Sequence, residues 1–206
     1  MKKTYTILTA TFCVCLVLSN ILETKQIGVT PHFDITGGLL VFPISYIIND
    51  CVTEIYGFRA ARDMIWLGFA LAFFFVLMAW LTDLLPAAPY WDNAEGFHAI
   101  FGLTPRVTMA SFLAFLLGSL VNAYSFQWMK EKTQGRRFAL RSIASSVLGE
   151  ILDSAIFFPL AFVGIIPPKA LLVIACSQVV LKTLYEVVCL PLTKQTIKYI
   201  RRYEDK

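Results

Sequence analysis

The chain has 206 residues, of which 57% are hydrophobic and only 16% are charged, with a mean hydropathy of +0.67 and a formal net charge of +4 at pH 7. A soluble domain usually carries about 25% charged residues, so this composition excludes an ordinary soluble domain and indicates an integral membrane protein. The phosphate-binding pattern G-x-x-x-x-G-K-[ST] is absent from the sequence, which excludes ATP hydrolysis by this chain.

Six apolar runs are long enough to cross a bilayer, for which one helix needs roughly 17–25 residues. They occupy nearly the whole sequence and predict an all-α integral membrane protein. Residues 1–206 are expected to form a single domain of six transmembrane helices, without an attached soluble domain. In chain order the expected helices are Tyr5–Thr24, Gly37–Tyr56, Met64–Leu85, Val107–Met129, Ser142–Ile166 and Lys169–Leu192.

Lysine and arginine are distributed unevenly between the segments that join these runs. If the N-terminus is cytoplasmic, fourteen of them lie in cytoplasmic segments and three lie in outer loops. The positive-inside rule predicts this asymmetry, so we expect both termini in the cytoplasm. The same distribution accounts for the net positive charge, and no nucleic acid partner is expected.

The cysteines and histidines do not follow a pattern typical of a metal site or a catalytic site. All five cysteines fall within the expected helices, where a thiol behaves as a small hydrophobic group. His32 and His98 fall in outer loops, so neither is expected to activate a nucleophile inside the membrane. We therefore expect no bound metal, no cofactor and no enzymatic activity.

Asparagine and aspartate recur at similar spacing in the two halves of the chain. Asn20 and Asp50 are thirty residues apart, and Asn122 and Asp153 are thirty-one residues apart. Three helices in each half would give the halves opposite orientations, as in the inverted repeats of many transporters. An inverted repeat of three plus three helices is therefore left open.

Four ionisable residues fall near the middle of the expected helices. With a rise of about 1.5 Å per residue, Asp50, Glu150, Asp153 and Lys182 share one narrow slab of the membrane. Each charge would cost about 2.5–3.5 kcal/mol if it faced lipid, so the four must face one another, water or a ligand. Glu54, on the same helix face as Asp50, lies nearer the cytoplasmic interface.

Polar and aromatic side chains recur at helical spacing around these charges and define a candidate substrate-binding site. We expect Asp50 and Asp153 to bind the donor groups of a ligand, and Lys182 to act as a counter-ion or as a donor to a carbonyl. Whether Lys182 pairs with Asp50 or with Asp153 is left open, and one such pair is also the purely structural alternative. The candidates are Asn20, Tyr46, Asp50, Glu54, Glu150, Asp153, Phe157, Gln178 and Lys182.

Two kinds of ligand suit such a site. A proton or a metal cation needs only the carboxylates. A flat heterocycle with adjacent N–H donors, such as a guanine edge, would also use Lys182, Asn20 and Gln178 for polar contacts. Tyr46 or Phe157 would stack on its ring. These residues alone indicate only a small polar solute.

The segment FPISYIINDCVTEIYGFRAAR, residues 42–62, resembles the signature of the queuosine precursor transporter family, also called the vitamin uptake transporter family. The resemblance implies a carrier of the bacterial inner membrane that imports 7-deazaguanine bases for tRNA modification. These bases are 7-cyano-7-deazaguanine, 7-aminomethyl-7-deazaguanine and queuine. The matching residues are Phe42, Pro43, Asp50, Thr53, Glu54, Tyr56, Gly57, Ala61 and Arg62, with weaker matches at Ser19-Asn20, RVTMASF from Arg106, SSVLGEILDSAIFF from Ser145, and Lys182 followed by Leu190-Pro191.

Two other functions are left open by the sequence. A proton- or cation-conducting membrane protein would need only the buried acids. The chain would also suit the substrate-binding subunit of an ATP-driven vitamin transporter. The preferred base, the energy source and the formation of a homodimer are not determined by the sequence.

Overall fold

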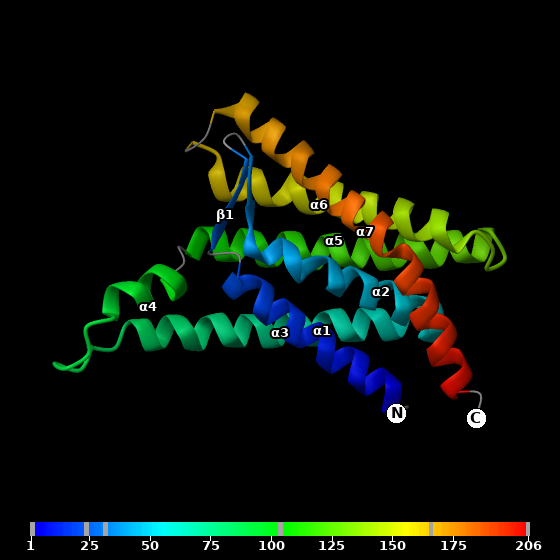
Figure 1. The fold of residues 1–206 in the computed structure, drawn as a ribbon, viewed down its shortest axis with the longest axis horizontal. Helices are drawn as coiled ribbons and strands as arrows, with labels where there is room; N and C mark the ends of the chain where they lie inside the picture. The colour runs from blue at the N-terminus through cyan, green and yellow to red at the C-terminus, as the bar shows by residue number, and fades with distance from the viewer. Residues whose placement is uncertain (1–2, 23–24, 31–32, 103–104, 165–166, 205–206) are drawn as a thin grey trace.

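The long apolar runs fold as helices, because a helix satisfies its own backbone hydrogen bonds where water is absent. The computed structural model describes residues 3–22, 25–30, 33–102, 105–164 and 167–204 (Figure 1). Two short strands, β1 (Gln26–Thr30) and β2 (Phe33–Thr36), pair antiparallel and lead into a 3-10 turn, η1 (Gly37–Leu40). The helices are α1 (Lys3–Leu22), α2 (Phe42–Tyr56), α3 (Phe58–Asp83), α4 (Ala94–Phe101), α5 (Pro105–Lys132), α6 (Phe138–Phe162) and α7 (Pro168–Glu204).

Five of the six expected transmembrane runs form helices that are long and apolar enough to cross a membrane. These are α1, α3, α5, α6 and α7, and their apolar surfaces remain exposed on the outside of the bundle. The expected ends Thr24 and Ile166 lie outside the described residues. Helix α7 continues past its expected end at Leu192 and carries the basic C-terminal residues as part of the helix.

The second expected helix, Gly37–Tyr56, differs from the prediction. Its first residues form η1, and the α-helix begins only at Phe42, with Pro43 in the first turn, where a missing N–H costs little. A helix of 15 residues is about 22 Å long, which is less than the roughly 30 Å hydrocarbon core. Helix α2 packs against α1, α3, α5 and α7, so it faces protein rather than lipid. A sixth crossing, formed by η1 and α2 together, stays a prediction.

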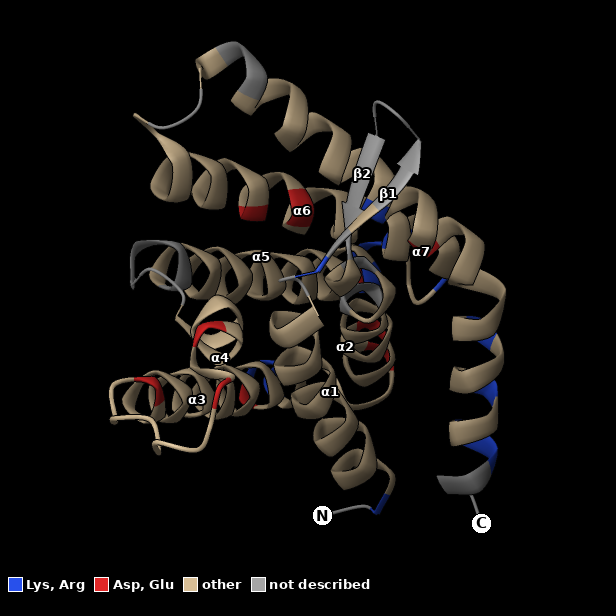
Figure 2. Cartoon of the chain, turned by 60° about the vertical axis from the view of Figure 1, so that its left-hand side comes forward, with Lys and Arg blue, Asp and Glu red and all other residues tan. Residues whose placement is uncertain are grey.

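The basic residues gather at one end of the bundle. Figure 1 shows both termini at this end, together with the α2–α3 junction and the turn between α5 and α6. Figure 2 shows lysine and arginine along the last turns of α7 and beside the N-terminus. We call this the basic end; the opposite end holds α4 and the β-hairpin and is called the hairpin end. The segments predicted to share one side of the membrane therefore share one end of the structure.

Helices α5 and α6 lie antiparallel and pack more closely than any other pair. Gly118 and Gly149 face each other: a Cβ built on Gly149 would lie 2.8 Å from the carbonyl oxygen of Gly118, and one on Gly118 would lie 2.9 Å from that of Gly149. Small residues allow this close approach of backbones, as in many membrane helix pairs. Asn122 and Asp153 flank the crossing, so α5 and α6 form the frame beside which the polar residues are placed.

We expect Gly149→Ala to lower the free energy of unfolding by about 1–3 kcal/mol, because the new methyl group would push the α5 backbone away from α6. Gly96→Ala is the matched control, since nothing lies within 4 Å of a Cβ built there and alanine favours helix formation. Thermal unfolding of the purified protein in detergent measures the difference. Equal stability of the two variants would contradict the close backbone contact.

Candidate functional site

Lys182 on α7 pairs with two carboxylates on α6. Its Nζ lies 2.9 Å from Glu150 Oε2 and 3.3 Å from Asp153 Oδ2. Glu150 and Asp153 are three residues apart and share one face of the helix. The side chains are largely buried, with exposed fractions of 4% for Glu150, 13% for Asp153 and 15% for Lys182. We call these three residues the lysine cluster; it answers the pairing question in favour of Asp153 and contains more carboxylate than ammonium.

Asp50 does not join the lysine cluster. Its Oδ2 contacts the Ser142 hydroxyl on α6, whose oxygen also lies 2.9 Å from Glu186 Oε1 on α7. Asp50, Ser142 and Glu186 are all buried, and we call the two acids, Asp50 and Glu186, the carboxylate pair. Ser142 precedes Glu150 by eight residues, so this contact lies about 12 Å nearer the basic end.

The prediction that Asp50 shares one slab with the lysine cluster is therefore wrong. The depth of Asp50 was counted along one continuous helix from Gly37 to Tyr56. That count gives its position within its own helix, whereas its position beside α6 is set by the contact with Ser142.

Tyr46 lies between the two groups. It is one helical turn from Asp50 on α2, and only 4% of its surface is exposed. It is close enough to Glu150 and Asp153 of the lysine cluster, and to Glu186, to interact with their charges. Tyr46 is therefore a candidate to contact a ligand held by the buried acids.

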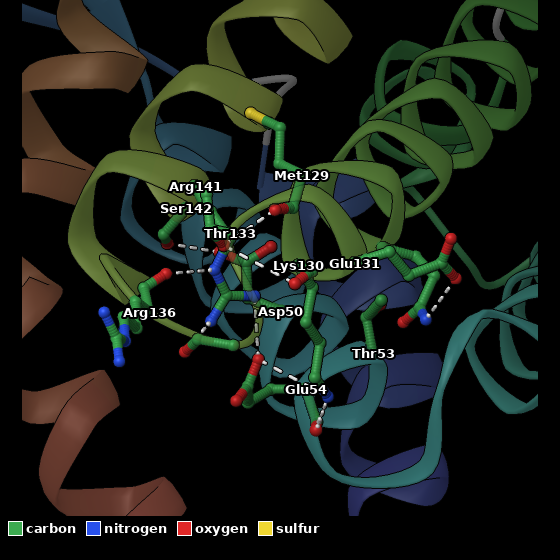
Figure 3. Close-up of polar contacts among 12 residues, drawn as sticks. Asp50, Thr53, Glu54, Met129, Lys130, Glu131, Thr133, Arg136, Arg141 and Ser142 are labelled. Carbon is green, nitrogen blue, oxygen red and sulfur yellow. Dashed lines mark hydrogen bonds and ion pairs between the residues drawn. The ribbon is translucent and has the colours of Figure 1, made fainter.

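Glu54, one turn after Asp50, belongs to a third group at the basic end (Figure 3). Its Oε2 lies 3.0 Å from Arg141 Nη1 and 3.6 Å from Lys130 Nζ, and its Oε1 lies 2.7 Å from Arg201 Nη2. Lys130 also donates to the backbone carbonyl of Glu54. We call these four residues the basic-end cluster. It joins α2 to the ends of α5 and α7 and to the start of α6.

Arg141 is charged but only 1% exposed, and its guanidinium has several polar partners. Its Nε donates to the carbonyl of Arg136 at 3.1 Å, and its Nη2 donates to the carbonyl of Gly135 at 3.3 Å. The guanidinium also lies 4.8 Å from the centre of the Phe126 ring, a distance at which a cation is attracted to the ring face. Glu54 supplies the opposite charge that the burial of Arg141 requires.

The remaining predicted residues have other surroundings. Asn20 is half-buried and lines a small apolar hollow with Phe75 and Phe101, near the hairpin end. Phe157 packs edge-on against Phe158 and Phe162, with ring centres 5.3 and 5.7 Å apart. Gln178 is half-buried on α7, one turn from Lys182 on the hairpin side. The structure thus brings together Tyr46, Glu150, Asp153 and Lys182, with Asp50 beyond them and Glu54 in a separate cluster.

Sequence reasoning missed the roles of Arg141, Ser142 and Glu186. Arg141 was counted only as one of the fourteen basic residues of the cytoplasmic segments, just before the expected helix Ser142–Ile166, but it lies in the first turns of α6. The spacing did contain a signal, because the polar stripe through Ser146, Glu150 and Asp153 reaches Ser142 when it is extended by one turn. Among the described residues, no group of three or more His, Cys, Asp or Glu side chains is arranged to hold a metal ion.

We expect Glu54→Gln to lower the free energy of unfolding by about 3–5 kcal/mol, because it leaves Arg141 buried without an opposite charge. Asp63→Asn is the matched control, since Asp63 pairs with Arg62 on the surface, where an ion pair contributes about 0–1 kcal/mol. Thermal unfolding in detergent at neutral pH compares the two variants. A Glu54→Gln variant as stable as Asp63→Asn would show that Glu54 is not needed to neutralise Arg141.

Comparisons with known proteins identify the family. The model of the putative vitamin uptake transporter family matches residues 36–195. The probable queuosine precursor transporter of Bacillus subtilis (strain 168) is 29% identical over 181 residues, 86% of this chain and 76% of that protein. The queuosine precursor transporter of Escherichia coli (strain K12) is 31% identical over 133 residues, 63% of this chain and 56% of that protein.

A third relative, the probable queuosine precursor transporter of Haemophilus influenzae (strain ATCC 51907 / DSM 11121 / KW20 / Rd), is 25% identical over 130 residues, which are 63% of this chain and 53% of that protein. No solved structure matches the chain. Its long apolar helices and its bacterial relatives make it a multi-pass membrane protein, and the matched family consists of transporters, not enzymes. The chain belongs to the putative vitamin uptake transporter family.

Proposed function

We propose that this protein imports queuosine precursors, that is, 7-deazaguanine bases, across the bacterial inner membrane with both of its termini in the cytoplasm. The observation that carries the proposal is the lysine cluster beside Tyr46, buried within a chain whose relatives are named queuosine precursor transporters. The basic end then faces the cytoplasm, in agreement with the positive-inside rule.

The chemistry of the lysine cluster suits the edge of such a base. A 7-deazaguanine presents a ring N–H and an amino group side by side, which one carboxylate can accept with its two oxygens. Glu150 and Asp153 provide two carboxylates for one ammonium, so one of them can leave Lys182 to bind the base. Lys182 would then donate to the ring carbonyl, and Tyr46 would contact the ring face.

The surplus carboxylate also favours one member of the class. Of the three bases, 7-aminomethyl-7-deazaguanine carries a cationic side chain that the second carboxylate would neutralise. An uncharged 7-cyano base would leave that carboxylate with Lys182 alone. We therefore expect the aminomethyl base to bind more tightly than the cyano base.

Release to the cytoplasm requires the basic-end cluster to open. Glu54 joins α2 to α5, α6 and α7 at this end, so its ion pairs close the route between the lysine cluster and the cytoplasm. Ion pairs at the end of a bundle can exchange partners with water, whereas the Gly118–Gly149 contact cannot open without separating two backbones. The transport cycle would therefore move α2 and α7 against the α5–α6 frame.

Binding of the bases to the purified protein tests this proposal. We expect at least one 7-deazaguanine base to bind more tightly than guanine. Asp153→Asn should weaken that binding about 10- to 150-fold, because it removes a hydrogen bond to a charged group worth about 1.5–3 kcal/mol. Isothermal titration calorimetry in detergent measures both affinities.

Asp92→Asn is the matched control for this test, because Asp92 is exposed in the segment between α3 and α4. It should bind the bases as the unmodified protein does. Binding of all the bases no better than guanine, or equal loss in both variants, would count against the lysine cluster as the substrate site.

A further inference from the structure

The carboxylate pair has one hydroxyl hydrogen to share between two acceptors. Ser142 Oγ lies within hydrogen-bond distance of Asp50 Oδ2 and of Glu186 Oε1, but a serine hydroxyl carries a single hydrogen. It can therefore donate to only one of the two carboxylates. The second contact is a hydrogen bond only if the other carboxyl group carries a proton and donates it to Ser142. The geometry thus accommodates one proton in addition to that of the serine.

The nearby cations are engaged by other acids. Arg141 is the cation closest to Asp50, but all three of its nitrogens bind Glu54 or the backbone carbonyls of Gly135 and Arg136. On the hairpin side the nearest ammonium is that of Lys182, which pairs with the two acids of the lysine cluster. At the basic end, Lys130 and Arg201 bind Glu54.

Among the residues that the structure describes, the other groups that face the pair carry no positive charge. On α6, Ser146 lies beside Glu186, and Glu150 is close enough to Glu186 for the two like charges to interact. Helices α1 and α3 pack on the other face of α2, where they place apolar side chains and the thiols of Cys13 and Cys15 against Ile48 and Val52. Two adjacent buried carboxylates without a cation of their own cannot both be ionised at low cost.

A polar side chain on α5 lies where it can hydrogen-bond to Asp50 in either protonation state of the acid. Asn122 is completely buried and approaches the Asp50 carboxylate. Neither its amide nitrogen nor its amide oxygen meets hydrogen-bond geometry with a described residue, and the same holds for Asp50 Oδ1. An amide beside a carboxylate can donate when the acid is ionised and accept when the acid is protonated, so Asn122 suits both states.

We propose that Asp50, Ser142 and Glu186 form a one-proton site that couples import of the base to the proton gradient. The proposal rests on the transport function proposed above. A proton from the outer solution binds one carboxylate oxygen of the pair and forms a neutral acid that donates to Ser142. Its transfer to cytoplasmic water breaks the same O–H bond and restores the second carboxylate.

A proton fits this position better than a metal cation does. The Ser142 hydroxyl already fills the space between the two carboxylates at hydrogen-bond distance. A hard metal ion needs several oxygen ligands gathered around one point.

The proton would control whether the helices stay together at the basic end. With one proton bound, Ser142 on α6 links α2 to α7 by two hydrogen bonds. Without it, two negative carboxylates face each other and repel α2 from α7. Arg141, the residue next to Ser142, would then be drawn from Glu54 toward Asp50, which would weaken the basic-end cluster and open the cytoplasmic side.

Transport in proteoliposomes tests the coupling. With the outside at pH 5.5 and the inside at pH 7.5, we expect faster uptake of the labelled base than with pH 7.5 on both sides. Glu186→Gln should lose this dependence on the pH gradient, because glutamine cannot release a proton. Glu131→Gln is the matched control, since Glu131 is an exposed acid near the same end of the bundle, and it should retain the dependence. Uptake that ignores the pH gradient, or follows a sodium gradient instead, would overturn the proposal but leave the transport function intact.

An infrared measurement tests the proton site without any substrate. We expect the purified protein at neutral pH to show the C=O stretch of a protonated carboxyl group, reduced in the double variant Asp50→Asn/Glu186→Gln and unchanged in Glu131→Gln. Both amides mimic protonated acids, so the double variant should also fold and melt no lower than the unmodified protein. An unreduced band would mean that both acids are ionised and would overturn the proposal, even if the base is transported.

Discussion

A charged group buried among apolar helices needs an opposite charge or a hydrogen bond, and α6 supplies one of these for each of the three buried polar groups. Arg141 neutralises Glu54 of α2, Ser142 joins Asp50 of α2 to Glu186 of α7, and Glu150 with Asp153 holds Lys182 of α7. The three groups are spread along more than three turns of one helix. The position of α2 and α7 in the bundle therefore depends on polar contacts with α6 rather than on apolar packing alone.

The contacts that α6 makes with α5 differ in kind from those that it makes with α2 and α7, and this difference indicates which helices move. Helices α5 and α6 meet through the backbones of Gly118 and Gly149, where a separation would leave a gap that no side chain fills. The contacts from α6 to α2 and α7 are ion pairs and hydrogen bonds between side chains, which can exchange partners during a cycle. We infer that α5 and α6 stay together while α2 and α7 change position. The polar contacts would hold α2 and α7 in place and would exchange partners when these helices move.

Much of the fold could be predicted from the sequence. Unpaired backbone N–H and C=O groups cost free energy in lipid, so long apolar runs form helices. The buried acids Asp50, Glu54 and Glu150 were predicted by the same argument, and so was a partner for Lys182, whereas Glu186 was not. The depth of Asp50 could not be obtained this way, because counting residues places a side chain only relative to the ends of its own helix. Its position beside α6 is set by the tertiary contact with Ser142, 92 positions away in the chain.

The role of Arg141 was hidden for a different reason. A basic residue near the end of an apolar run is normally counted with the loop, where it sets topology and faces water. Its burial depends on Glu54 arriving from α2, a contact between residues 87 positions apart that no local pattern reveals. The predicted inverted repeat also stays a prediction, and its two asparagines have different surroundings. Asn122 is completely buried beside Asp50, whereas Asn20 is only half-buried in the hollow near the hairpin end.

The spacing of Asp50 and Glu54 acquires a physical reason from this arrangement. Four residues apart on α2, they face two consecutive residues of α6, Ser142 and Arg141. One acid sits where its charge can be cancelled by a proton, and the other sits where its charge is cancelled by arginine. A change in the protonation of the first acid alters the electrostatic attraction on that same arginine. Because the two carboxylates are one turn apart, a single proton bound beside Asp50 changes the strength of the Glu54–Arg141 ion pair that closes the cytoplasmic side. One carboxylate alone would not have this effect.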